Sequence, residues 1–153
     1  MNQKFTSIQY DEHVNEGIAE GDNILTDTTK YQRLVGRLLY LTMTRPNIAF
    51  SVQVLSQFMH CPKQSHMNAA LRVVRYIKEA PGLGLLMPAE DTTKLTAYCD
   101  SDWGACMETR RSVTGFLVKF GEGLISWKSK KQEIVLRSSA EAEFRVWHYV
   151  QLK

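Results

Sequence analysis

The chain has 153 residues, of which 44% are hydrophobic and 23% are charged, and its formal net charge is +3. These values are typical of a soluble globular protein with one sizeable core or two small ones. No run of about 18 apolar residues occurs, so no membrane-spanning helix is expected. A polar start and three cysteines without a CxxC pair, Cys61, Cys99 and Cys106, predict an intracellular protein, cytoplasmic or nuclear and not secreted.

Charge is distributed unevenly along the chain. The first 30 residues contain six carboxylates and two lysines, so the remainder is more basic than the total suggests. Residues 1–29 also lack helical periodicity, and we expect an extended or disordered polar leader there. Within it, Tyr10-Asp-Glu-His13 is expected to be an exposed polar turn rather than a metal site.

Residues 30–80 are expected to form three amphipathic helices with short connections. Their apolar stripes are Leu34, Leu38 and Leu41; Ile48, Val52, Leu55 and Met59; and Met67, Ala70, Leu71, Val74 and Ile77. Pro46 separates the first two helices, and Ser65 is expected to cap the third, which Pro81-Gly82 ends. His60, Cys61 and His66 then fall at a solvated junction, which we favour over a zinc site.

Residues 81–93 are expected to be a linker or a short strand. Gly82-Leu-Gly-Leu-Leu-Met87 contains a G-x-G, but no strand precedes it and no helix pattern follows. A turn leading into a short strand is therefore favoured over a phosphate-binding loop.

Residues 94–153 predict a strand, a two-stranded hairpin and a helix. The first strand runs from Leu95 into Asp100 and Asp102, the hairpin spans Val113–Phe120 and Leu124–Trp127, and Ser138 opens the helix. Carboxylates at the end of an apolar strand are costly to bury unless a positive group binds them, which makes this end a candidate site. Ser138-Ser-Ala-Glu141 is a capping box, which accounts for Glu141 but not for Glu143.

Six basic residues could contact phosphates: Arg110, Arg111, Lys128, Lys130, Lys131 and Arg137, with Trp127 nearby. The alternative is an ordinary solvated basic face.

Several blocks of sequence resemble copia-type retrotransposon polyproteins. Three blocks resemble the end of the reverse transcriptase: Tyr31–Phe50, Val54–Phe58 and Ala70–Ile77. Four blocks resemble the ribonuclease H domain that follows it: Tyr98–Trp103, Arg111–Phe116, Ile125–Gln132 and Ser138–Phe144. The blocks stand in family order. The resemblance implies an α+β fold: a truncated ribonuclease H-like domain, with a three-stranded antiparallel sheet and its first helix, preceded by three helices from the end of the reverse transcriptase.

The family cuts the RNA strand of RNA–DNA hybrids with two divalent metals, Mg²⁺ or Mn²⁺. By resemblance, Asp100 and Glu143 are the catalytic metal ligands. Asp102 belongs to the same motif, although a turn also accounts for its carboxylate. Two further acidic ligands of the family are not found before Lys153.

We therefore expect a polyprotein fragment that is inactive alone, whose partners are RNA–DNA hybrid or other nucleic acid and the rest of the polyprotein, with no membrane. The alternatives are a non-enzymatic nucleic-acid-binding remnant, a repurposed protein, or a chain with no selected function.

Overall fold

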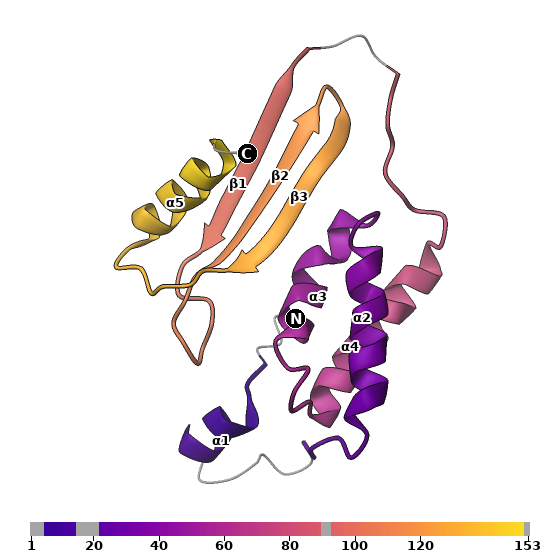
Figure 1. The fold of residues 1–153 in the computed structure, drawn as a ribbon, viewed down its shortest axis with the longest axis vertical. Helices are drawn as coiled ribbons and strands as arrows, with labels where there is room; N and C mark the ends of the chain where they lie inside the picture. Colours follow the sequence, from indigo (N-terminus) through magenta and orange to yellow (C-terminus); the bar gives the residue numbers. More distant parts are fainter. Residues whose placement is uncertain (1–4, 15–21, 90–92, 152–153) are drawn as a thin grey trace. The chain divides into compact units, whose positions relative to one another are not determined.

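The computed structural model describes residues 5–14, 22–89 and 93–151 and divides the chain into two compact units, Met1–Leu83 and Gly84–Lys153. The first unit contains α1 (Ile8–Val14), α2 (Thr28–Leu41), the 3-10 turn η1 (Pro46–Ile48), α3 (Ala49–Ser56) and α4 (Gln64–Glu79) (Figure 1). The second contains β1 (Leu95–Asp102), β2 (Val113–Phe120), β3 (Gly123–Lys131) and α5 (Ser139–Gln151). Within the described ranges, no helix combines the length and the hydropathy needed to cross a membrane.

The helical unit has its own apolar core, formed where α2, α3 and α4 meet. Asp27 caps α2, since its carboxylate accepts from the amides of Thr29 and Lys30. The phenol of Tyr31 donates to the carbonyl of Leu55 at 2.8 Å, and burial raises the pKa of this phenol. The fully buried members are Tyr31, Val35, Leu38, Ile48, Val52, Leu55 and Ala70. Most of the predicted stripes therefore do form the core.

Leu71 is the exception among the predicted core residues of α4. Its side chain is 39% exposed, whereas Ala70 is buried, so the prediction that Leu71 faces the core is wrong. Met67, Val74 and Ile77 are partly buried against the core. Successive residues of a helix are about 100° apart, so Leu71 lies at the margin of the stripe of α4 that faces α2 and α3.

The expected extended leader contains a helix. α1 covers Ile8–Val14, and Asp11 within it is only 7% exposed because it pairs with Lys63. The prediction of an exposed turn at Tyr10–His13 is therefore wrong, since a contact with a distant residue orders this stretch. Residues 1–4 and 15–21 of the leader lie outside the described residues.

The start of α4 also differs from expectation. The helix begins at Gln64, so Ser65 lies inside its first turn and is not the cap. Both the amide and the hydroxyl of Ser65 donate to the carboxylate of Asp22, each at 2.9 Å. The Asp22 carboxylate thus accepts from an amide in the first turn of α4, as the side chain of a local N-cap residue would.

No strand forms in the described part of residues 81–93, so the short strand expected there is wrong. Met87 and Pro88 instead lie close to Gly123: a Cβ placed on Gly123 would lie 3.5 Å from Met87 Sδ and from Pro88 Cδ. This extended segment therefore leaves little room for a side chain at the start of β3.

The sheet is antiparallel in the order β1-β2-β3, so β1 is an edge strand of it. Asp100 lies opposite Gly115, Cys99 lies opposite Phe116, and Phe116 lies opposite Lys128. Gly121, with φ of 57°, makes the tight turn between β2 and β3. These elements confirm the predicted α+β class and are consistent with a truncated ribonuclease H-like fold.

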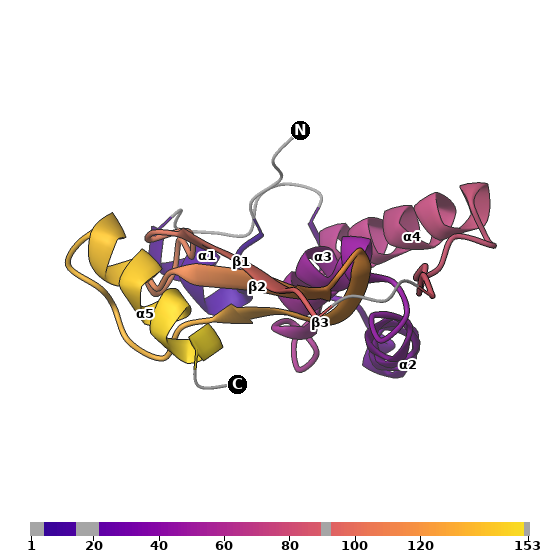
Figure 2. The ribbon, with the colours of Figure 1, turned by 90° about the horizontal axis from the view of Figure 1, so that it is seen from above.

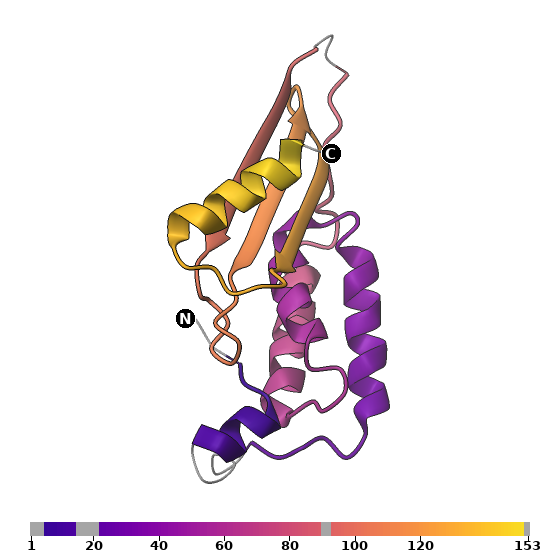
Figure 3. The ribbon, with the colours of Figure 1, turned by 60° about the vertical axis from the view of Figure 1, so that its left-hand side comes forward.

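Helix α5 lies beside the sheet and packs mainly on β1, with a smaller contact on β2 (Figures 1, 2 and 3). Ala142 and Val146 are its buried residues. Ser138 Oγ accepts from the amide of Glu141 as the capping box predicts. The reciprocal bond differs, because the Glu141 carboxylate accepts from the amide of Arg137 at 3.0 Å rather than from that of Ser138.

Candidate functional site

Asp100 lies in the edge strand β1 and is exposed to solvent. One of its carboxylate oxygens, Oδ1, accepts from the amide of Ser101 at 2.8 Å. Asp102, also exposed, lies opposite Val113 at the end of the strand. Because side chains alternate along a strand, Asp100 and Asp102 share one face of the sheet, and Ser101 belongs to the other.

The face that α5 covers follows from the strand register. Phe116 lies directly opposite Cys99, so both belong to the same face, and its ring centroid is 5.8 Å from that of Tyr149 in α5. Ser101, on that face, is 9% exposed. Asp100 therefore projects from the face of β1 that α5 does not cover.

Glu143 lies on the flank of α5 that is directed toward β1. Successive residues of a helix are about 100° apart, and Ala142 and Val146 mark the side of α5 that faces the sheet. Arg145 and Tyr149 lie on one flank of that side and line a cavity over β2 and β3. Glu143 lies on the opposite flank, exposed beside the edge strand. Asp100 and Glu143 thus lie on two elements in contact, β1 and α5, but Asp100 projects from the face of β1 that α5 does not cover.

This edge offers a small set of carboxylates for a divalent ion. Within residues 5–14, 22–89 and 93–151, no group of three or more His, Cys, Asp or Glu side chains is arranged to hold a metal. An ion held by both Asp100 and Glu143 would have to lie at the outer edge of β1, where it could reach a carboxylate on either face, with Asp102 nearby in sequence. Mg²⁺ is compatible with such a site, because it commonly keeps several waters and binds through one or two carboxylates plus phosphate oxygens.

The predicted basic residues fall in three places. Lys128, Lys130 and Lys131 line the cavity between α5 and the hairpin, where Lys130 pairs with Glu133 at 3.0 Å. Arg110 and Arg111 lie in the connection between β1 and β2, and Arg137 lies two residues before α5. Arg110 has a φ of 52°, and its amide donates to the carbonyl of Cys106 at 2.8 Å.

Arg145 also lines the cavity, and the sequence reasoning missed it. The available signal was its spacing of four residues from Tyr149, which places both on one flank of a helix. That spacing acquires meaning only once α5 is known to pack against β2 and β3.

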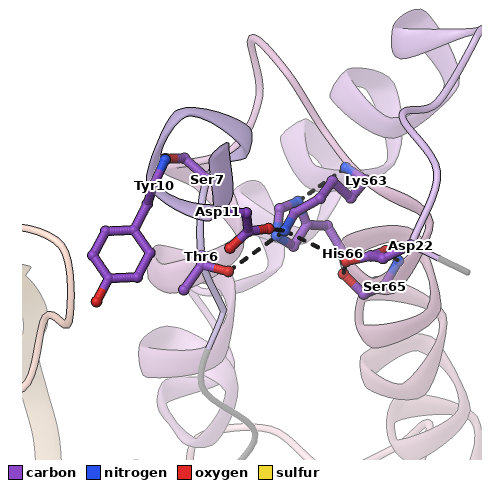
Figure 4. A network of polar contacts seen from close by, with 8 residues as sticks. All are labelled: Thr6, Ser7, Tyr10, Asp11, Asp22, Lys63, Ser65 and His66. Atoms are coloured by element: carbon purple, nitrogen blue, oxygen red, sulfur yellow. Dashed lines mark hydrogen bonds and ion pairs between the residues drawn. The ribbon is translucent and has the colours of Figure 1, made fainter. Parts of the chain in front are cut away.

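A second cluster missed from the sequence joins the leader to α4 (Figure 4). The Lys63 ammonium pairs with Asp11 and lies 3.4 Å from Asp22 Oδ2. Burial opposes ionisation of both carboxylates, but their hydrogen bonds and the charge of Lys63 outweigh it, so the pKa of each lies below its ordinary value. The cluster thus connects two parts of the leader to the start of α4.

His66 belongs to this cluster and is fully buried, so the predicted solvated junction is wrong at this residue. Its Nδ1 accepts from the amide of Lys63 at 3.1 Å, and its ring stacks on Phe58 with centroids 4.1 Å apart. Burial, followed by the charge of Lys63, lowers the pKa of His66 to about 4, although the charges of Asp22 and Asp11 act in the opposite direction. His66 is therefore neutral near pH 7.

Comparison with known proteins gives clear relatives. The chain is 46% identical over 121 residues to the retrovirus-related Pol polyprotein from transposon RE1 of Arabidopsis thaliana, covering 79% of this chain and 8% of that protein. It is 38% identical over 115 residues to the Pol polyprotein from transposon TNT 1-94 of Nicotiana tabacum, covering 74% of this chain and 9% of that protein.

A shorter relative is the secreted RxLR effector protein 161 of Plasmopara viticola, 44% identical over 115 residues, or 74% of this chain and 81% of that protein. No family model and no solved structure matches the chain.

The comparisons confirm the predicted resemblance to transposon polyproteins. The chain spans about 8% of the length of the Arabidopsis polyproteins that it matches, while the match covers about 79% of the chain itself. The chain therefore belongs to the family of retrovirus-related Pol polyproteins of transposons, and corresponds to a small part of such a polyprotein.

Proposed function

We propose that the second unit is a ribonuclease H-like segment of a copia-type Pol polyprotein, in which Asp100 and Glu143 are ligands of a divalent metal. The observation that supports this is that both carboxylates are exposed and that α5, which carries Glu143, packs mainly on β1, which carries Asp100. Asp102 would assist from the end of the same strand.

Mg²⁺ or Mn²⁺ bound in such a site supplies an activated water and stabilises the leaving oxygen when the RNA strand of a hybrid is cut. The residues of this chain would hold and orient the ion. Two carboxylates bind Mg²⁺ weakly, because the ion loses water reluctantly and needs phosphate oxygens to complete its shell. We therefore propose that the isolated chain is inactive, and that acidic ligands from another part of the polyprotein complete the site.

The test is a chimera of this chain extended by the polyprotein segment that follows the matched region in transposon RE1. The extended protein should cleave a labelled RNA–DNA hybrid in Mg²⁺ or Mn²⁺, and its Asp100→Asn variant should not. The unextended chain should give no cleavage on prolonged incubation. A folded chimera without activity would refute the ribonuclease H assignment, and cleavage by the unextended chain that Asp100→Asn abolishes would refute the proposed incompleteness.

A second candidate function is non-enzymatic binding of nucleic acid by the basic residues. It is favoured by the gathering of Lys128, Lys130 and Lys131 with Arg145 around one cavity. Such binding would weaken steeply with salt, because each phosphate contact releases counterions. Binding that does not respond to salt would exclude it.

A further inference from the structure

A groove between α5 and the β2–β3 hairpin combines cations with aromatic rings. Its volume is about 270 Å³, and its lining includes four cationic side chains, Lys128, Lys130, Lys131 and Arg145, against one carboxylate, Glu133. The groove is therefore electropositive. It lies on the opposite flank of α5 from Glu143, and so is separate from the carboxylates at the β1 edge.

Two of these cations are available to an incoming anion. Lys130 is neutralised by Glu133 and Lys131 donates to Cys106 Sγ at 3.7 Å, whereas neither Lys128 nor Arg145 forms a salt bridge with any carboxylate in the described part of the chain. Lys128 projects from β3 and Arg145 from α5, so they approach the groove from its two walls. A phosphate between them would contact both cations.

Aromatic rings line the groove beside these cations. Phe116 and Tyr149 lie with their ring centroids 5.8 Å apart and tilted by 53°, and Tyr149 remains 41% exposed. Because Arg145 and Tyr149 are four residues apart, they lie on one flank of the helix. An aromatic surface next to an unpaired guanidinium suits a ligand that carries both a planar ring and a phosphate.

The aromatic surface continues along the exposed side of α5. The ring centroid of Phe144 is 6.3 Å from that of Trp147 and 6.5 Å from that of His148. Phe144 is 65% exposed and Trp147 is 53% exposed. On the helix, His148 lies between Arg145 and Phe144, so the rings form a band that begins at the groove. A ligand longer than one nucleotide could therefore stack its bases in succession.

We propose that this groove binds single-stranded nucleic acid, with a phosphate held by Lys128 and Arg145 and a base stacked on Tyr149. The exposed rings of Tyr149, Phe144 and Trp147 can stack on unpaired bases, whereas the bases of a duplex are already stacked on one another. Sequence preference is weak, because every base has a π-face and phosphates are identical along the strand. The inference rests on the nucleic-acid-binding candidate above, and it is independent of the metal site.

The experiment measures fluorescence anisotropy of labelled oligo-dT and oligo-rU of ten nucleotides, titrated with the full chain at several salt concentrations. The Lys128→Gln/Arg145→Gln double variant should weaken binding at least tenfold and reduce the magnitude of the salt slope by about 1.4, the value for two phosphates on a single strand. The matched control is Arg33→Gln/Arg37→Gln, which removes the same charge from the exposed surface of α2 and should change affinity less than threefold.

Tyr149 tests stacking separately from charge. Tyr149→Phe keeps the ring and should retain affinity, whereas Tyr149→Leu should weaken binding at least about fivefold. Circular dichroism checks that each variant is folded. For the unaltered chain, oligo-dT should shift the amide resonances of Lys128, Arg145 and Tyr149, which makes the test independent of any variant that fails to fold.

Different failures have different meanings. Equal weakening by the two double variants would show diffuse electrostatic attraction, and would overturn the groove while leaving nucleic-acid binding intact. A duplex or an RNA–DNA hybrid that competes as well as the single strand would overturn the single-strand assignment. Absence of binding at low salt would overturn the proposal, but it would leave the result of the chimera cleavage assay unaffected.

Discussion

Lys63 and Asp11 form a buried ion pair across 52 residues of sequence, with side chains only 3% and 9% exposed. Asp22 Oδ2 lies 3.4 Å from the same ammonium and binds the first turn of α4 through Ser65. One lysine therefore joins two parts of the leader to the start of a helix. A buried charge that loses its partner is much more costly than a lost surface ion pair.

Lys63→Met should destabilise the helical unit by about 3–5 kcal/mol, because it leaves the Asp11 carboxylate buried without its counter-charge. Urea denaturation followed by helical circular dichroism measures the change. The matched control is Lys30→Met, which removes the lysine that pairs with Asp27. Because the side chains of Lys30 and Asp27 are 79% and 48% exposed, this change should leave the stability unchanged. Adding Asp11→Asn to Lys63→Met should recover part of the loss. Equal effects of the two methionine variants would contradict the buried role of Lys63.

Stability of the helical unit should depend on pH through His66. The pKa of this buried imidazole is lowered to about 4, while an unfolded histidine titrates near about 6.5. The unfolded chain thus binds a proton at a higher pH than the folded chain does. Stability is complete above about pH 6.5 and decreases as the pH falls to about 4, by up to about 3 kcal/mol.

The pH dependence is checked by urea denaturation at several pH values for the native chain and His66→Gln. Glutamine at this helix position can also accept from the Lys63 amide, so it keeps the cap but does not titrate. The variant should be less stable at pH 7, because it loses the stacking on Phe58, and should show a flatter profile between pH 6.5 and 4. Asp11 and Asp22, whose pKa values are lowered, contribute further loss only at more acidic pH. Parallel profiles for the two proteins would rule out His66 as the titrating group.

Local pattern predicted the second unit more accurately than the leader. β2 covers Val113–Phe120 as expected, and α5 begins after Ser138, whose Oγ accepts from the amide of Glu141 as predicted, because these signals lie within a few residues of one another. α1 and the burial of His66 depend instead on Lys63, which is distant from the leader, and no local spacing reveals that contact.

The candidate site shows the same limit. The sequence placed Asp100 on a strand and Glu143 on a helix, but it could not tell which flank of α5 faces β1. The burial of Ala142 and Val146 in the structure shows which side of α5 faces the sheet. The same orientation of the helix places Arg145 in the lining of the groove. Tertiary contacts thus decide which of several polar residues act together.

The core of the helical unit can be tested at Leu55 and Leu71. Leu55 is 2% exposed, and Leu71, which the sequence stripe also assigned to the core, is 39% exposed. Leu55→Ala should therefore cost about 2–5 kcal/mol of unfolding free energy, since it leaves a cavity. Leu71→Ala removes the same atoms from a partly solvated position and should cost much less. Comparable losses in urea denaturation would show that α4 is rotated relative to this description.

The proposed sharing of one ion by Asp100 and Glu143 can be tested without catalytic activity. Mn²⁺ broadens the resonances of nearby amides even when it binds weakly, so substoichiometric Mn²⁺ titrated into labelled chain reports where the ion spends its time. If the two carboxylates share an ion, amides around Ser101 in β1 and around Ala142 in α5 should broaden together. Asp100→Asn should reduce the broadening in both segments, because removing one of two ligands weakens the whole site. Glu143→Gln should likewise reduce the broadening in both segments.

The matched control is Glu108→Gln, which removes an acidic residue from the loop after β1 and should leave the pattern unchanged. If Asp100→Asn suppresses the broadening in β1 but the resonances of α5 remain broadened, the two carboxylates bind separate ions and the proposal of a shared metal site is wrong. Broadening centred on Glu122 and Glu133 would locate the ion at the hairpin and lead to the same conclusion. Loss of broadening in both segments, in each of the two variants, is the result expected for one site, because each carboxylate then contributes to a single binding equilibrium.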